Sequence, residues 1–197
     1  MEISKKIFFS RGFSKVTVDE LAEELGVSKK TIYANFESKD ELLSAVLEWH
    51  MEEIVGKTDE ILSSSDDFMV RLYNLCALIS EAISQKSPEF MSDLQKNRED
   101  LWQRLEEHRR VGVLSTSSRL MEEGMKLGLI RRDVDKEIAN LVLLFSISGI
   151  INPKTLGKKS FDGALAFDGI MSIFFEGILT DKARGSVKKY RSTEPVC

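Results

Sequence analysis

The sequence lacks the features of membrane-spanning, disulfide-stapled and metal-binding proteins. Only two of its 197 residues are cysteine, three are proline and two are histidine. Two cysteines, Cys76 and Cys197, make no disulfide framework, and His50 and His108 are isolated rather than spaced as a metal-binding pair. No apolar run reaches the roughly 20 residues of a spanning helix, and no signal peptide precedes the first motif. We therefore expect a cytoplasmic protein with no metal and no cofactor.

Catalytic motifs are also missing. The sequence has no glycine-rich phosphate loop, no GxSxG, no CxxC and no convergent set of nucleophile, base and orienting residue. Cys76 lies on a helical apolar stripe, where a buried small hydrophobe is the first interpretation and a redox sensor the alternative. The composition and motifs argue against an enzyme.

An excess of basic residues is missing as well. The net charge is −4, and in the first 47 residues seven basic side chains stand against eight acidic ones. A general nucleic-acid binder is basic. Any binding to nucleic acid must therefore depend on a few placed contacts rather than on overall charge.

The most informative segment is TVDELAEELGVSKKTIYANFESKDELL, residues 17–43. Thr17-x-x-Glu20 and Ser38-x-x-Glu41 are capping boxes that open helices. Gly26 suits the left-handed position that ends a helix sharply, and Ser28 can cap the helix that follows. The pattern predicts two short helices joined by a tight turn, a helix-turn-helix, with a third helix behind them.

The second helix of this unit presents a polar outward face. Lysine can donate to guanine or to phosphate, threonine and asparagine can contact base edges, and a tyrosine hydroxyl suits a phosphate. Lys39 lies in the first turn of the next helix, where a cation opposes the helix dipole unless it faces a phosphate. The alternative is a solvated polar face on a small helical bundle.

At these residues the chain resembles the tetracycline-repressor (TetR) family of bacterial regulators. The resemblance runs from Ile7-Phe8 and Gly12-Phe13 through GVSKKTIYANFESKDELL, about a quarter of the chain. It implies phosphate contacts from Thr17, Tyr33 and Lys39 and base-edge contacts around residues 28–31. Asn35 stands where the family often has histidine. The DNA-binding set implied by the chemistry and the resemblance is Thr17, Ser28, Lys29, Lys30, Thr31, Tyr33, Asn35 and Lys39.

The rest of the chain predicts helices only, so the fold class is all-α. We expect a helix-turn-helix DNA-binding domain of three helices over 1–46, a helical effector-binding and dimerisation domain over 47–181, and a flexible basic tail over 182–197. Within the second domain, one helix should run over 39–61, and two apolar helices, 136–151 and 161–179, should flank a loop at 152–160.

The last two helices are the candidate dimer interface. The 161–179 helix has two apolar stripes and needs two partners, and a two-fold protein suits a palindromic operator. In TetR-like proteins these helices pair with their symmetry mates, whereas burial inside the monomer is the alternative. The predicted interface residues are Leu141, Leu144, Phe145, Ser148, Phe167, Met171, Phe174 and Ile178.

A small-molecule pocket is expected between the middle helices, because regulators of this type commonly bind an effector there. Tyr73, Trp102 and His108 are candidate polar contacts in an otherwise apolar site, although such stripes are more often plain core. The candidate pocket residues are Phe68, Leu72, Tyr73, Cys76, Phe90, Met91, Trp102, Leu105, His108 and Phe145.

Three functions remain open from the sequence. The first is a dimeric repressor that binds a palindromic operator and is released by a small hydrophobic effector through the 39–61 helix, the one element expected to join the two domains. The second is a DNA-binding regulator of the same fold controlled by a protein partner. The third is a helical enzyme or binding protein with an incidental helix-turn-helix.

Overall fold

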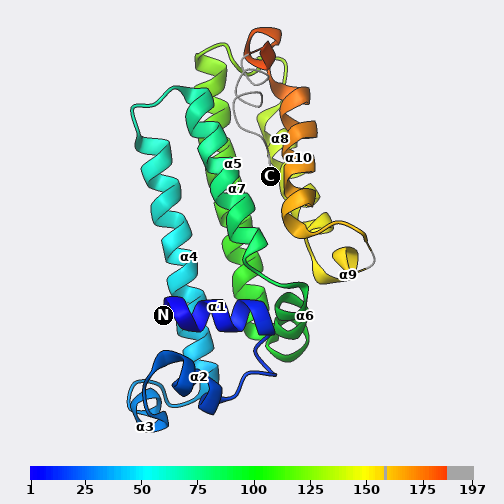
Figure 1. Ribbon diagram of the computed structural model, residues 1–197. Helices are drawn as coiled ribbons and strands as arrows, with labels where there is room; N and C mark the ends of the chain where they lie inside the picture. The colour runs from blue at the N-terminus through cyan, green and yellow to red at the C-terminus, as the bar shows by residue number, and fades with distance from the viewer. Residues whose placement is uncertain (158, 186–197) are drawn as a thin grey trace.

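The computed structural model describes residues 1–157 and 159–185, and this part of the chain is built from helices (Figure 1). A single β-bridge, between Ile130 and Leu179, is its one strand-like pairing. None of its helices has both the length and the apolarity needed to cross a bilayer. The tail was expected to be flexible from residue 182, but Ala183 is fully buried and the Arg184 guanidinium donates to the Leu179 carbonyl at 3.0 Å. Residues 186–197, Cys197 among them, lie outside the described residues. The helices are α1 (Glu2–Arg11), α2 (Val18–Leu25), α3 (Lys29–Tyr33), α4 (Lys39–Ser63), α5 (Phe68–Ser84), α6 (Pro88–Asn97), α7 (Glu99–Lys126), α8 (Lys136–Ile150), α9 (Pro153–Leu156) and α10 (Gly163–Ile178).

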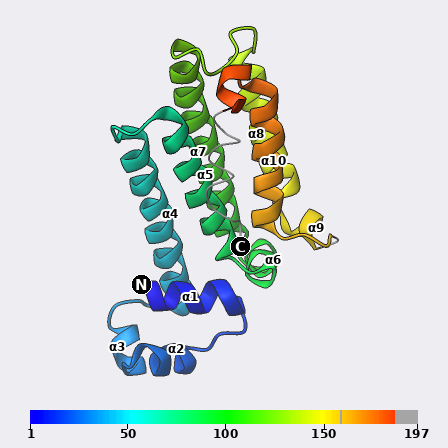
Figure 2. The ribbon, with the colours of Figure 1, turned by 45° about the horizontal axis from the view of Figure 1, so that its top comes forward.

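The N-terminal unit forms through the local signals in its sequence. The Thr17 hydroxyl accepts from the Glu20 N–H, and the Glu20 carboxylate accepts from the Thr17 N–H at 2.7 Å, which completes the capping box. Gly26 ends α2 in the left-handed conformation, with φ of +64°. Ser28 and Ser38 cap α3 and α4. Figures 1 and 2 place α1, α2 and α3 together at one end of the molecule.

This unit does not have a core of its own. Phe8, Leu21 and Val46 belong to one buried apolar cluster that continues into α6 and the start of α7, through Phe90 and Leu101. Two domains were expected with a boundary at residue 46, yet the hydrophobic core crosses that boundary. The DNA-binding unit is therefore held by packing as well as by chain connection.

Two helices, rather than one, join the N-terminal unit to the rest of the chain. α4 runs from Lys39 to Ser63, as expected, but α6 also docks on α1. The Ser87 N–H donates to the Phe9 carbonyl at 2.8 Å, and the Ser14 N–H donates to the Asp93 carboxylate at 2.6 Å. The expectation of a single connecting helix is wrong, because it rested on chain order and took no account of tertiary docking.

The longer helices form a closed ring around a central space. α4 packs on α5, α5 on α10, α10 on α8, α8 on α7, and α7 on α4. The segment expected to be a loop at 152–160 contains the short helix α9. The Asn152 side chain caps it by accepting from the Thr155 N–H at 3.0 Å, and Pro153 provides a compatible first residue.

Candidate functional site

The candidate DNA-binding surface is centred on the short helix α3. The Ser28 hydroxyl accepts from the Thr31 N–H at 3.0 Å, which fixes the start of α3. Ile32 is buried and anchors the helix, whereas Lys30 and Tyr33 are exposed. The geometry is that of a recognition helix, with one side packed on the protein and the other open to solvent.

Some of the predicted DNA-binding side chains are already engaged within the chain. Lys29 forms an ion pair with Asp19 at 2.8 Å, and the hydrogen bond to this carboxylate raises the pKa of Lys29 above its ordinary value. The Asn35 amide donates to the Thr31 carbonyl at 2.9 Å. Within the described ranges, Lys30 and Tyr33 have no side-chain hydrogen bond or ion pair and project freely from the surface.

Lys39 has a role that the sequence did not predict. Its ammonium donates to the carbonyls of Phe13 and Val16 at 3.1 and 2.8 Å and lies 4.3 Å from the centre of the Phe13 ring. The charge in the first turn of α4 was expected to face a phosphate; in the structure two backbone carbonyls accept from the ammonium, and a phosphate contact from Lys39 stays a prediction. Lys39 ties the start of α4 to the segment between α1 and α2.

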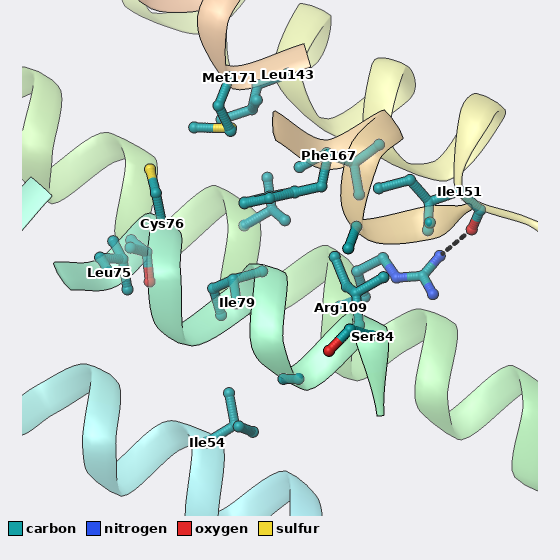
Figure 3. Close-up of a pocket in the computed structure, with 18 of the residues that line it drawn as sticks. Ile54, Leu75, Cys76, Ile79, Ser84, Arg109, Leu143, Ile151, Phe167 and Met171 are labelled. Atoms are coloured by element: carbon teal, nitrogen blue, oxygen red, sulfur yellow. Dashed lines mark hydrogen bonds between the residues drawn. The ribbon is translucent and has the colours of Figure 1, made fainter. Parts of the chain in front are cut away.

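A cavity of about 810 Å³ fills the centre of the helix ring. Figure 3 shows Ile54 from α4, Ile79 from α5, and Phe167 and Met171 from α10 around it. Its size lies within the range of small-molecule sites, about 300–1,000 Å³, and most of its walls are apolar. The predicted pocket residues that line it are Phe68, Leu72, Cys76, Met91, Leu105 and His108.

Four predicted pocket residues lie elsewhere. Tyr73 is 44% exposed, because it follows the cavity-lining Leu72 by one residue and so points away. Phe90 and Trp102 are buried in the core shared with the N-terminal unit. Phe145 is 67% exposed on the outside of α8. Helical periodicity identified apolar stripes but not which of them faces the cavity.

One end of the cavity has a basic floor that the sequence did not predict. It contains His50, which is only 3% exposed, together with Lys86, His108 and Arg109. The Lys86 ammonium lies 2.9 Å from Nε2 of His50. Burial, with repulsion from Lys86 and Lys5, lowers the pKa of His50 to about 3, so His50 is neutral at neutral pH. Lys86 lies in the connection between α5 and α6, where helical spacing carries no information.

Cys76 lines the cavity and does not have the character of a reactive thiol. Burial raises the pKa of Cys76 to about 12. The thiolate is the nucleophilic form, and it is negligibly populated at neutral pH. The side chain therefore contributes apolar wall, which favours the first interpretation of this residue over a redox sensor.

The outer surface of α8 and α10 carries a set of exposed apolar side chains. The dimer stripe predicted on α10 is wrong in its orientation: Phe167, Met171, Phe174 and Ile178 line the cavity instead. Leu144 on α8 is also buried. The sequence of α10 has two apolar stripes, and packing on α5 and α8 turns the stripe predicted for the dimer interface toward the cavity. We call the exposed set the outer apolar face; its residues are Ile138, Leu141, Val142, Phe145, Leu165 and Ile173.

Comparison with known proteins assigns the N-terminal unit. Residues 2–46 match the family model described as bacterial regulatory proteins, tetR family. The HTH-type transcriptional repressor KstR2 of Rhodococcus jostii is 28% identical over 157 residues, 71% of this chain and 70% of that protein. The uncharacterized HTH-type transcriptional regulator YvaF of Bacillus subtilis is 22% identical over 178 residues, which cover 90% and 92% of the two chains.

A solved structure extends the likeness to the whole fold. A transcriptional regulator from Cytophaga hutchinsonii superposes with a TM-score of 0.71 and 19% identity, covering 91% of this chain and 96% of that one. The recognition helix, the all-helical architecture and the family match define a DNA-binding transcriptional regulator rather than an enzyme. The N-terminal unit, residues 2–46, is of the type found in the tetR family of bacterial regulatory proteins.

Proposed function

We propose that this protein is a dimeric repressor that binds a palindromic operator and releases it when a small, largely apolar effector enters the cavity. The observation that carries the proposal is the position of the cavity. His50 of α4 and Met91 of α6 line it, and these two helices hold the DNA-binding unit. A ligand that shifts either helix would displace the recognition helices, which must match a half-site spacing of about 34–36 Å.

The roles on the DNA side follow from the exposure of the side chains on α3; Lys30 and Tyr33 are free among the described residues, and the Thr31 hydroxyl is held by the Ser28 hydroxyl at 2.9 Å. We propose that Lys30 and Thr31 contact base edges and that Tyr33 contacts phosphate. Thr17 and Lys39 support the surface from behind through the capping box and the carbonyl contacts. The similarity to a protein named as a repressor supports the direction of regulation.

The outer apolar face supports the dimer. Six exposed apolar side chains lie on two helices that pack on each other, and a gathered exposed apolar surface is typical of a protein–protein interface. A second copy, related by a two-fold axis, would cover this face and place two recognition helices for a palindrome. The cytoplasm is the compartment that this function requires.

The first test selects duplexes from a random library and measures the affinity of the enriched sequence by fluorescence anisotropy. The proposal expects an enriched palindrome with two half-sites. Enrichment of no sequence over the starting library would overturn the proposed DNA function.

A parallel thermal-shift screen of small molecules should give compounds that raise the melting temperature, because a ligand that binds only the folded state stabilises it. A screen in which no small molecule raises the melting temperature would favour the protein-partner alternative.

A further inference from the structure

The basic floor of the cavity contains a cation that has no acidic partner among the described residues. The Lys86 ammonium donates to the Ala82 carbonyl at 2.7 Å and lies 2.9 Å from Nε2 of His50. It also lies 5.1 Å from the centre of the Phe9 ring. No carboxylate among the described residues lies within 4.0 Å of it. All of its close contacts are therefore neutral groups.

The other charges near Lys86 are balanced by their own partners. On α1, Lys5 pairs with Glu2 at 3.0 Å, and it pairs with Glu53 of α4 at 3.3 Å. On α7, Arg109 pairs with Glu106 at 2.8 Å. Within the part of the chain that the structure describes, the positive charge left unbalanced at the floor is that of Lys86.

This arrangement is unfavourable when the cavity is empty of anions. Burial, with repulsion from Arg109 and Lys5, lowers the pKa of Lys86 to about 7. His108 also lines the floor. Burial is the larger cause that lowers the pKa of His108, and repulsion from Lys86 is the smaller one. A half-buried cation without an acid among the described residues costs free energy that a bound anion would offset.

The walls next to this floor are apolar. Ile79, Ile83, Leu143, Phe167 and Met171 line the space beyond Lys86 and Arg109, and Figure 3 shows several of them grouped around a common hollow. A molecule that fills this space must present an extended apolar body and place a polar group only at the basic end. Because the Lys86 ammonium is the one unbalanced cation at this end among the described residues, the polar group of the ligand should carry one negative charge.

We propose that the effector is an amphipathic monocarboxylate whose head group pairs with the Lys86 ammonium and whose apolar body lies along the α5, α8 and α10 walls. This inference rests on the proposed effector role of the cavity and names the ligand class. The head group would lie at the junction of α1, α4 and α6, because Lys86 contacts both Phe9 and His50 and precedes Ser87, which is bonded to α1.

The test measures dissociation constants by calorimetry for dodecanoate and for dodecan-1-ol, which has the same tail and no charge. A charge-assisted contact is worth about 1.5–3 kcal/mol, so the wild type should prefer dodecanoate by about tenfold or more. Lys86→Met should lose this preference while it keeps the affinity for the alcohol. Lys86→Arg should retain the preference. Binding of the alcohol by Lys86→Met also shows that the variant is folded.

Three results would overturn the proposal. The first is equal affinity of the wild type for the acid and the alcohol. The second is an unchanged preference in Lys86→Met. The third is binding of dodecanoyl-coenzyme A alone, with neither the free acid nor the alcohol bound. Failure of the proposed function is separate: it would appear as a Lys86-dependent preference for dodecanoate with no effect on operator affinity.

Discussion

At the scale of single residues, two lysines show what sequence patterns could and could not predict. The caps at Thr17, Ser28 and Ser38 were predicted correctly, because each depends on atoms within three residues in the chain. The partners of Lys39 and Lys86 could not be predicted. They are carbonyls, a histidine and an aromatic ring brought close only by tertiary packing.

Lys30 and Lys39 should differ when each is truncated. Lys30→Ala removes a free side chain from the recognition helix and should change base preference at one operator position, by about 1–3 kcal/mol. Lys39→Met leaves two carbonyls without their donor and should lower the melting temperature and weaken all duplexes alike. Anisotropy against a panel of single-base operator variants distinguishes the two patterns. Lys29→Ala, which removes a side chain paired with Asp19, is the matched control. A change in base preference caused by Lys39→Met would refute the assignment of Lys39 as a residue that supports the DNA-binding surface from behind.

The stability of the protein should rise with pH because of Lys86. The unfolded chain has the ordinary pKa of 10.5, whereas burial and repulsion lower the pKa in the fold to about 7. Between these values the unfolded chain binds more protons, so the free energy of unfolding increases as pH rises from about 7. Urea unfolding at pH 7 and pH 9 should show a larger increase for the wild type than for Lys86→Met. The exposed Lys126→Met is the control, and equal increases in the wild type and Lys86→Met would contradict the assignment.

At the scale of helices, periodicity and caps predicted most element boundaries. The helices expected over 136–151 and 161–179 are Lys136–Ile150 and Gly163–Ile178 in the structure. α9 was missed because one capped turn has no periodicity to detect. The docking of α6 on α1 was missed because it depends on Asp93 and Phe90 contacting residues far away in the sequence.

The contact of α6 with the connection between α1 and α2 should transmit the effect of the ligand. Asp93 accepts from the N–H and hydroxyl of Ser14, at 2.6 and 2.5 Å. Burial alone would raise the pKa of Asp93, but these hydrogen bonds keep it below its ordinary value. Asp93→Ala should lower stability by about 1–3 kcal/mol and reduce the loss of operator affinity that effector causes. Urea unfolding and anisotropy check both effects, with Glu89→Ala on the exposed side of α6 as the control. If effector lowers operator affinity as much in Asp93→Ala as in the wild type, the effect of the ligand is transmitted through α4 and not through α6.

At the scale of the whole molecule, the sequence predicted the all-α class and a pocket between the middle helices, but not which side of α10 faces that pocket. Both stripes on α10 are apolar and both contain buried residues, and only the packing of α10 on α5 and α8 decides which one faces the cavity. A cavity depends on five helices that close a ring without filling it, and no local pattern encodes that.

The outer apolar face should hold two copies together. Phe145→Glu and Ile173→Glu each place a charge where the dimer would exclude water, and each should shift the protein toward monomer. Both side chains are exposed, 67% and 78%, so the monomer should stay folded. Sedimentation velocity at micromolar concentration measures the change, and the exposed Val111→Glu on α7 should leave the dimer intact. A wild type that sediments as a monomer would contradict the interface.

The central claim is that occupancy of the cavity and binding of the operator oppose each other. The most direct test is a reciprocal pair of affinities: operator affinity with and without saturating dodecanoate, and dodecanoate affinity with and without saturating operator. Linkage requires both to fall by the same factor, and a coupling of about 1–3 kcal/mol corresponds to roughly 5–150-fold. Tight binding of dodecanoate that leaves operator affinity unchanged would contradict the account.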